Sequence, residues 1–346
     1  MHSAASTAVR GAPSATPAAV RGDSLHATGR SAKYREALTF AERVARFDHA
    51  VVLIEGEPGT GKTLLARYIH ALSRRADEVF HRVDLGALDD ALSGSDLFGH
   101  VSGAFTGAQG KRIGHFLSAQ RGTLFLDELA KASKPVQQKL LHAIEYREVT
   151  PVGAERPVPF NARLVAATNV SLEERVEAGE FLPDLLPRFG CFRVRLPALR
   201  ERRGDILPLA RHFAEAHAPA FGYRTGAPAF DDALGEALQA AGWPGNVREL
   251  EAAVQYLLVC GGGDPVLGLE HCEGQLAHLR RGAEDEAPLS PEHVRAVVEK
   301  AGGVSAAARQ LRVSRPTVYR YLDRVAAAAA TACLLLADVP ELVLVP

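Results

Sequence analysis

Cysteine pairs, long apolar runs and an excess of charge are all missing from this 346-residue sequence. Its four cysteines lie far apart and form no CxxC pair, which excludes a disulfide framework and a cysteine zinc site. The most apolar run, 325–337, holds about 13 residues, fewer than the ~20 that cross a bilayer. No apolar core follows Arg10, which excludes a signal peptide. These absences predict a soluble protein of the cytoplasm.

The charge is balanced in total but uneven along the chain. Lys and Arg total 40, Asp and Glu total 41, and the formal net charge is −1, which excludes a chain that is basic throughout. Residues 264–288 contain six acidic and two basic residues, whereas residues 289–325 contain seven basic and three acidic residues. This switch predicts an acidic linker followed by a small basic module.

The hydrophobic pattern changes along a chain that is long enough for two or three domains. Residues 1–28 are rich in small residues and proline and show no period, which predicts a flexible arm. Apolar runs then alternate with helical segments, which predicts a parallel α/β sheet. Five runs have the character of buried strands: 50–55, 80–85, 123–126, 162–167 and 192–196.

Beyond Pro197 the strand signal fades. The pattern predicts helices over 203–259, broken near 219–228 and 242–245. The expected boundaries are an α/β core over 29–196, a helical region over 197–262, an acidic linker over 263–288, a basic helical module over 289–325 and an alanine- and leucine-rich tail over 326–346.

A glycine-rich segment between the first strand and a helix fits the phosphate-loop pattern GxxxxGK(S/T). It consists of Gly56, Glu57, Pro58, Gly59, Thr60, Gly61, Lys62 and Thr63. Glycines let successive N–H groups point at phosphate oxygens, and the helix N-terminus adds a favourable dipole. Lys62 would contact the β- and γ-phosphates, and the Thr63 hydroxyl would bind Mg²⁺. The alternative is a glycine-rich turn before a helix, without a ligand. In that helix, Leu65, Ile69 and Leu72 are predicted to share one buried face.

Two carboxylates end a later apolar strand. Asp127 is predicted to bind Mg²⁺ and Glu128 to polarise the attacking water as a general base. The alternative is a strand that ends in solvated acids. Asn169 closes the next strand, where it would sense the γ-phosphate, although its pattern alone also suits a turn.

A flexible, glycine-flanked tip is predicted between the phosphate loop and the acidic strand. It consists of Gly103, Ala104, Phe105, Thr106, Gly107 and Ala108. Exposing a Phe costs about 1.5–3 kcal/mol relative to burial, so a partner surface is the natural explanation. The alternative is a Phe that is buried within its loop.

These motifs closely resemble those of the bacterial enhancer-binding proteins, the AAA+ activators of sigma-54 RNA polymerase. The hallmark hexapeptide GAFTGA is intact at 103–108, and the resemblance covers about residues 30–325. It is accompanied by GEPGTGKT (56–63), SDLFGH (95–100), GTLFLDE (122–128), AATN (166–169), RVRLPALRERRGDI (193–206) and WPGNVREL (243–250). The resemblance implies an AAA+ P-loop ATPase with a parallel sheet, a helical lid (197–262) and a small all-α helix-turn-helix domain.

In that family, ATP hydrolysis in a ring, usually a hexamer, raises the GAFTGA loop against sigma-54 and remodels the closed promoter complex to an open one. The resemblance implies that Phe105 and Thr106 make the sigma-54 contact and that Arg248 reads the phosphate. It also implies that Arg188 reaches the ATP of the neighbouring subunit, which would make hydrolysis depend on assembly.

Three positions depart from the family pattern. Thr63 replaces the usual Glu and restores the general phosphate-loop pattern, so Mg²⁺ binding should not suffer. Asp84 stands where relatives carry an Asn that pairs with the catalytic Glu, so two carboxylates would repel or share a proton. Leu182 replaces the first of two arginines, which leaves trans activation weak or dependent on Arg188 alone.

The basic module over 289–325 predicts three helices: 291–301, 305–311 and one that opens at Ser314. It is similar to the Fis-type helix-turn-helix of the same family. The residues expected to face DNA are Ser314, Arg315, Thr317, Tyr319 and Arg320. The alternative is a three-helix bundle with a solvated basic face.

The leading hypothesis is therefore an ATP-dependent, sigma-54-specific activator that binds upstream DNA. Because only about 30 residues precede the core, control by a separate regulatory protein or by expression level is expected. One alternative is a DNA-binding regulator whose ATPase has decayed, and another is an AAA+ machine that acts on a different substrate.

Overall fold

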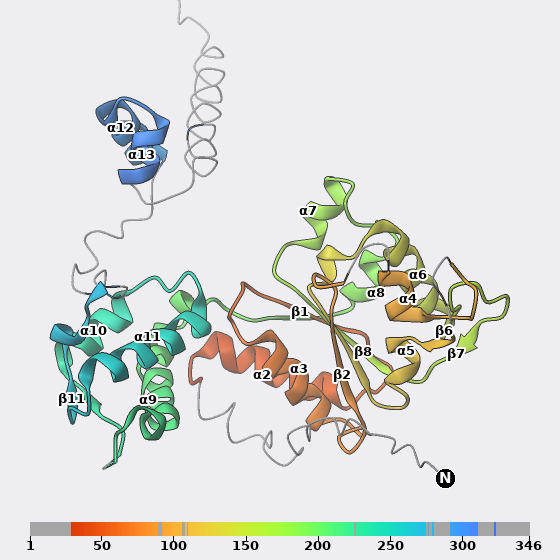
Figure 1. Ribbon diagram of the computed structural model, residues 1–346, viewed down its shortest axis with the longest axis horizontal. Helices are drawn as coiled ribbons and strands as arrows, with labels where there is room; N and C mark the ends of the chain where they lie inside the picture. The colour runs from red at the N-terminus through yellow and green to blue at the C-terminus, as the bar shows by residue number, and fades with distance from the viewer. Residues whose placement is uncertain are drawn as a thin grey trace, which may run out of the picture. The chain divides into compact units, whose positions relative to one another are not determined.

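The computed structural model describes residues 29–88, 92–105, 108, 110–224, 226–274, 276, 279, 291–310 and 322 (Figure 1). The chain divides into two compact units, with the boundary after Leu279. In the part of the chain so described, no helix is both long and apolar enough to cross a membrane.

A five-stranded sheet forms the centre of the first unit. Its strands are all parallel and follow the order β2-β5-β8-β1-β9. They are β1 (Val52–Glu55), β2 (Phe80–Asp84), β5 (Thr123–Asp127), β8 (Arg163–Thr168) and β9 (Phe192–Arg195). The predicted parallel α/β sheet is thereby confirmed, because each of the five apolar runs forms one strand.

Alternating side chains divide this sheet between two hydrophobic layers. Leu53 belongs to one layer, whereas Val52 and Ile54 belong to the other. Helices α2 (Ala32–Ala45) and α3 (Lys62–Ala71) build the layer on the Val52 side (Figure 1). The layer on the Leu53 side is built by α4 (Ser93–Phe98), α5 (His115–Ser118), α6 (Lys134–Tyr146), α7 (Leu172–Glu177) and α8 (Leu186–Gly190).

Helix α3 follows the phosphate loop and packs on the sheet through part of its predicted face. Leu65 and Ile69 are buried, as predicted. Leu72 is 43% exposed, so its place on that face was predicted wrongly. The reason is that α3 ends at Ala71, which leaves Leu72 in the C-cap position where the chain turns away.

Two short hairpins extend from the sheet and were not predicted. One pairs β3 (Gly99–His100) with β4 (Arg112–Ile113), and the other pairs β6 (Glu148–Val149) with β7 (Val158–Pro159). Strands of two residues are too short to show alternation in a sequence. An isolated bridge between His100 and Val152 joins the two hairpins.

The lid packs its helices around Trp243, which is 1% exposed. The helices predicted over 203–259 are confirmed, but the structure adds a two-residue strand pair. The lid and the segment after it contain η3 (Leu199–Glu201), η4 (Arg203–Asp205), α9 (Ile206–His217), η5 (Ala218–Phe221), β10 (Ala229–Phe230), α10 (Asp232–Ala240), α11 (Asn246–Gly261), β11 (Val266–Leu267) and η6 (Leu269–His271). Asp231 caps α10 by accepting the Leu234 N–H at 2.7 Å.

The second unit contains two described helices, α12 (Pro291–Ala301) and α13 (Val304–Gln310). They match the first two helices predicted for the basic module. The third predicted helix lies outside the described residues except for residue 322, and Ser314, Arg315, Thr317, Tyr319 and Arg320 all lie outside them.

Candidate functional site

The carboxyl ends of three neighbouring strands bring the predicted site together. The phosphate loop follows β1, Asp127 ends β5, and Asn169 follows β8. Since β8 lies between β5 and β1 in the sheet, these three segments meet at one edge. In open parallel sheets this edge is where ligands bind.

The phosphate loop takes a shape that needs its glycines. Gly59 has φ +77° and Gly61 has φ +103°, both in the left-handed region that favours glycine. Gly61 caps α3, whose first N–H groups have no carbonyl partner within the helix. Lys62 Nζ lies over the loop and donates to the carbonyls of Gly56 at 2.7 Å and Glu57 at 3.0 Å. The loop therefore gathers free helix N–H groups and one ammonium, as phosphate requires.

The charge of Lys62 is balanced by the acids across the site. Burial lowers the pKa of the Lys62 ammonium, while the carboxylates of Asp127 and Glu128 act to raise it. The nearby Arg248 guanidinium also lowers it. This coupling places the lysine, both acids and the lid arginine within one electrostatic site.

Thr63 and Asp127 lie in contact, as a shared metal site requires. The Thr63 hydroxyl donates to Asp127 Oδ2 at 3.3 Å, and Asp127 is 7% exposed. Hydroxyl and carboxylate oxygens are ligands that Mg²⁺ accepts. Arg82 of β2 donates to the same Asp127 oxygen at 2.9 Å. The residues present thus fit a magnesium site beside the phosphate loop.

Glu128 sits at a sharp turn after β5, with φ +56°. Its carboxylate pairs with the Lys131 ammonium, and the pKa of Lys131 is raised first by Glu128 and then by Asp84. Asp84 also lies 4.0 Å from Arg82. Two cations therefore offset the repulsion expected between Asp84 and Glu128.

Two residues predicted to contact the nucleotide lie outside the phosphate loop itself, Asn169 directly after β8 and Arg248 on α11. Asn169 is exposed and lines a cavity of about 460 Å³ together with Gly56 and Glu57. Arg248 lies on α11, where its Cβ would be 3.3 Å from a Cβ placed on Gly59. Both residues are therefore next to the phosphate loop, as predicted.

The GAFTGA segment is closed at its base and exposes its aromatic ring. The Gly103 N–H donates to the Ala108 carbonyl at 2.9 Å, and the Ala108 N–H donates to the Phe105 carbonyl at 3.0 Å. Phe105 is 37% exposed, and its ring packs edge-to-face with the His100 ring, with 5.1 Å between the ring centres. Thr106 and Gly107 lie outside the described residues. The expected exposed Phe is confirmed.

Arg188 lies on α8 and is not part of the phosphate loop. Its guanidinium donates to Glu145 of α6 at 3.1 Å, with both side chains well exposed. Leu182 is partly buried against the core, and its N–H donates to Gln137 Oε1 at 2.8 Å. Only Arg188 of these two positions thus presents a charged group to solvent.

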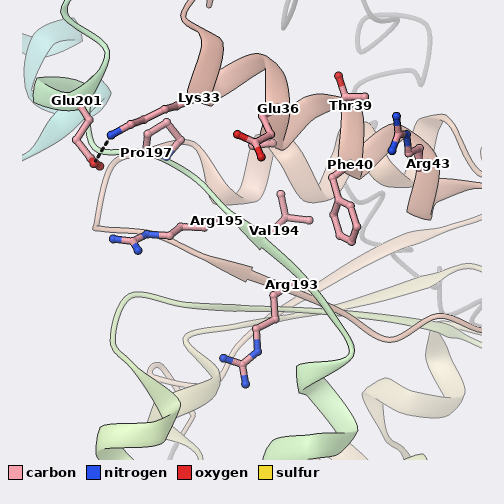
Figure 2. A pocket seen from close by; sticks show the side chains of 11 residues that line it. Lys33, Glu36, Thr39, Phe40, Arg43, Arg193, Val194, Arg195, Pro197 and Glu201 are labelled. Carbon is pink, nitrogen blue, oxygen red and sulfur yellow. Dashed lines mark hydrogen bonds and ion pairs between the residues drawn. The ribbon is translucent and has the colours of Figure 1, made fainter.

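A second cavity, of about 720 Å³, lies between α2 and β9 and shares Arg193, Arg195 and Glu201 with the first (Figure 2). Its charged side chains come from α2, β9 and η3. Lys33 Nζ of α2 lies 3.2 Å from Glu201 Oε1 of η3. The lining residues of this cavity include no member of the phosphate loop. It is lined by Lys33, Glu36, Ala37, Thr39, Phe40, Arg43, Arg193, Val194, Arg195, Pro197 and Glu201.

Sequence reasoning missed the partners that hold the motif residues. Arg82 and Lys131 contact the two acids, and Asn246, Arg200 and Arg202 contact the phosphate loop. Arg82 lies two residues before Asp84 on one strand, and Lys131 lies three after Glu128, so local spacing offered a signal for both.

Two family models match this chain. The first, described as the Sigma-54 interaction domain, matches residues 27–195, and the second, described as the AAA+ ATPase lid domain, matches residues 200–288. The sigma54-dependent transcriptional regulator SfnR of Pseudomonas fluorescens is 42% identical over 257 residues, covering 73% of this chain and 68% of that protein. The chain belongs to the sigma-54-dependent transcriptional regulators. It has the AAA+ fold, with a parallel sheet and a helical lid.

Other relatives agree. The sigma54-dependent transcriptional activator SfnR of Pseudomonas putida is 44% identical over 241 residues, covering 69% of this chain and 64% of that protein. The transcriptional regulatory protein ZraR of Klebsiella oxytoca is 40% identical over 317 residues, covering 89% and 70%. This chain thus spans between 64% and 70% of the length of these three relatives.

Solved structures give the same fold. NtrX of Brucella abortus in complex with ADP has a TM-score of 0.65 and 27% identity, covering 88% of this chain and 69% of that chain. Its complex with ATP has a TM-score of 0.64, also at 27% identity, covering 86% and 68%.

Proposed function

We propose that this protein is an ATP-dependent activator that remodels sigma-54 RNA polymerase from closed to open promoter complexes. The proposal rests above all on Lys62, the Thr63–Asp127 pair and Glu128 meeting at one sheet edge, in a chain whose GAFTGA segment exposes Phe105. The names of its relatives support the same function.

ATP with Mg²⁺ is the proposed ligand of the phosphate loop. Thr63 and Asp127 would hold the metal, whose bound charge neutralises phosphate oxygens. Lys62 would exchange its contacts with the loop carbonyls for contacts with phosphate. The Arg82 guanidinium keeps the Asp127 carboxylate oriented toward Thr63.

Hydrolysis is assigned to groups on either side of the phosphates. Glu128 accepts the proton of the attacking water, whose oxygen bonds to the γ-phosphorus as the bond to the leaving ADP oxygen breaks. Arg248 and Asn169 lie beside the loop to read the γ-phosphate. Arg188 would leave Glu145 to reach the ATP of a neighbouring subunit, which couples hydrolysis to a ring, proposed as a hexamer.

The work of the cycle is assigned to separate parts of the chain. Hydrolysis belongs to the core over 29–196 and the lid over 197–262, and the GAFTGA loop pushes on sigma-54. The module over 289–325 binds upstream DNA, and the protein acts in the cytoplasm.

A second candidate is a DNA-binding regulator with a weakened ATPase. Leu182 and Asp84 favour it, because Leu182 packs against the core at a position where the family pattern has an arginine, and Asp84 stands where that pattern has an Asn. The complete set of Lys62, Thr63, Asp127 and Glu128 opposes it.

The test is promoter opening by sigma-54 RNA polymerase with the wild-type chain, with and without ATP, and with Thr106→Ala. We expect opening only with ATP, and no opening by Thr106→Ala. The absence of ATP-dependent opening by the wild type would overturn the proposal. Phosphate release in the same samples separates the two candidates, since the second predicts little or none.

A further inference from the structure

The lid holds the backbone of the phosphate loop directly. Asn246 Nδ2 donates to the Pro58 carbonyl at 3.0 Å. The N–H of the next lid residue, Val247, donates to the Gly59 carbonyl at 3.0 Å. Two successive carbonyls of the loop are therefore fixed by the first turn of α11.

The next carbonyl of the loop, that of Thr60, is also held by the lid. The buried Arg202 donates to it at 3.3 Å, and its guanidinium lies 4.6 Å from the centre of the Tyr34 ring. In a planar trans peptide the C=O and N–H point in opposite directions. The N–H groups of Gly59 and Gly61, which share peptide planes with the Pro58 and Thr60 carbonyls, therefore point away from the lid, to the side that binds phosphate. The Thr60 N–H instead donates to the Glu57 carbonyl at 3.4 Å.

Asn246 uses its whole side chain in this arrangement. It is fully buried, and its Oδ1 accepts the Leu199 N–H at 2.7 Å while Nδ2 also donates to Glu57 Oε2 at 3.1 Å. Its φ of +55° is a left-handed conformation that Asn tolerates better than most side chains. One amide group thus joins the phosphate loop, the start of the lid at Leu199 and the first turn of α11.

Glu57 makes a second contact between the phosphate loop and the lid. Both terminal nitrogens of Arg200 donate to its carboxylate, and these bonds hold the pKa of Glu57 at about 2. Gly59 permits the close approach, because a Cβ there would lie 2.1 Å from the Gly245 carbonyl oxygen. The backbones of the phosphate loop and the lid are therefore in close contact at Gly59.

We infer that Asn246 is a positioning residue that couples the lid to the phosphate loop, so that nucleotide binding and lid orientation are one linked event. Coupling of this kind is reciprocal: a lid that shapes the loop is itself fixed when the loop binds phosphate. The inference rests on the proposed function, because the ligand it assumes is a nucleotide.

The lid contains a tryptophan whose fluorescence can report on its conformation. Trp243 is the only tryptophan of the 346 residues. Its buried indole N–H donates to the Leu238 carbonyl at 2.8 Å, and its own carbonyl accepts the Asn246 N–H at 2.8 Å. A change in the lid at Asn246 should therefore change tryptophan emission.

The experiment measures ADP binding to the full chain by calorimetry and by tryptophan emission. Asn246→Gly keeps the left-handed backbone and removes every side-chain contact. We expect its ADP dissociation constant to rise about tenfold, as the loss of one or two buried hydrogen bonds predicts, and the emission change on ADP binding to disappear. Asn246→Asp places a carboxylate against Glu57 and should weaken binding further.

Leu257→Ala is the matched control, because it removes a buried lid side chain that lies on α11 several turns from the loop. It should lower the melting temperature and leave the ADP affinity within about twofold of wild type. The inference is overturned if Asn246→Gly binds ADP like the wild type, or if Leu257→Ala weakens binding equally. Failure of the wild type to bind ADP would instead overturn the proposed function, and this inference with it.

Discussion

The phosphate loop and the GAFTGA loop are both rich in glycine, but the protein holds them in opposite ways. The first is fixed along its backbone by the lid, through the carbonyls of Pro58, Gly59 and Thr60. The second is closed by hydrogen bonds at its base and presents Phe105 to solvent.

The difference shows that glycine serves two ends in one chain. At Gly59 it permits a close approach between two backbones, and the result is a rigid cradle. At Gly103, which has φ +79°, a Cβ would meet no atom of the described residues within 4 Å, so the glycine there permits a left-handed turn rather than a close approach. A rigid loop suits ligand binding, and a free tip suits contact with a partner.

The largest expected effect is on ATP hydrolysis beside the phosphate loop. Glu128→Gln should lower ATP turnover by about 10²- to 10⁴-fold, because the general base is lost. Its ADP affinity should stay within about threefold of wild type, since the carboxylate receives a proton rather than holding the loop. Phosphate release and calorimetry measure the two quantities.

Glu155→Gln is the control for this change, because Glu155 is an exposed glutamate on the loop between β6 and β7. It should leave turnover unaltered. Turnover by Glu128→Gln near the wild-type rate would mean that another group accepts the proton.

An intermediate effect is expected at the base of the GAFTGA loop. Gly153 has φ +78°, and a Cβ there would lie 2.8 Å from Ala104 Cβ. Gly153→Ala should therefore shift the loop and reduce promoter opening about fivefold, in addition to losing about 1–2 kcal/mol of unfolding free energy to backbone strain.

Gly179→Ala separates these two causes. Gly179 has φ +69° but no atom within 4 Å of the added Cβ, so it should lose the same stability and keep full promoter opening. Chemical denaturation and promoter opening would be measured on both variants. Equal opening by both would show that the contact with Ala104 does not position the loop.

The smallest expected effect concerns the Glu57–Arg200 pair. The pKa of Glu57 is about 2 in the folded protein, against about 4.3 in an unfolded chain. A lowered folded pKa contributes stability above the unfolded value, and that contribution is lost as the pH falls toward 2. The pair is exposed, so solvent screening limits it to under about 1 kcal/mol.

Unfolding free energies of wild type and Glu57→Gln at pH 6 and pH 3.5 measure this contribution. The difference between the two proteins should be larger at pH 6. A difference that stays constant or grows at pH 3.5 would contradict the assigned cause.

The five sheet strands could be predicted because each is a continuous apolar run, such as Val52–Glu55, buried on both faces. The two hairpins could not, because two-residue strands such as Arg112–Ile113 carry no period. Leu72 was misplaced because the end of α3 depends on a turn that periodicity does not show.

The residues of the site likewise fall into those that could be predicted from the sequence and those that could not. Lys62, Thr63, Asp127 and Glu128 could be predicted because phosphate and Mg²⁺ chemistry fixes their types and order. Asn246 could not, because its contact with Glu57 joins residues 189 positions apart. Contacts of that range arise only when the lid folds back onto the core.

Promoter opening and ATP turnover of Phe105→Ala, measured in one preparation beside the wild type, test most directly whether the two loops divide the work. We predict turnover within about twofold of wild type, because Phe105 is part of the exposed tip and makes no described contact with the phosphate loop. Opening should fall at least about tenfold, the loss expected for an aromatic anchor. Unchanged opening, or an equal loss of both activities, would contradict this division.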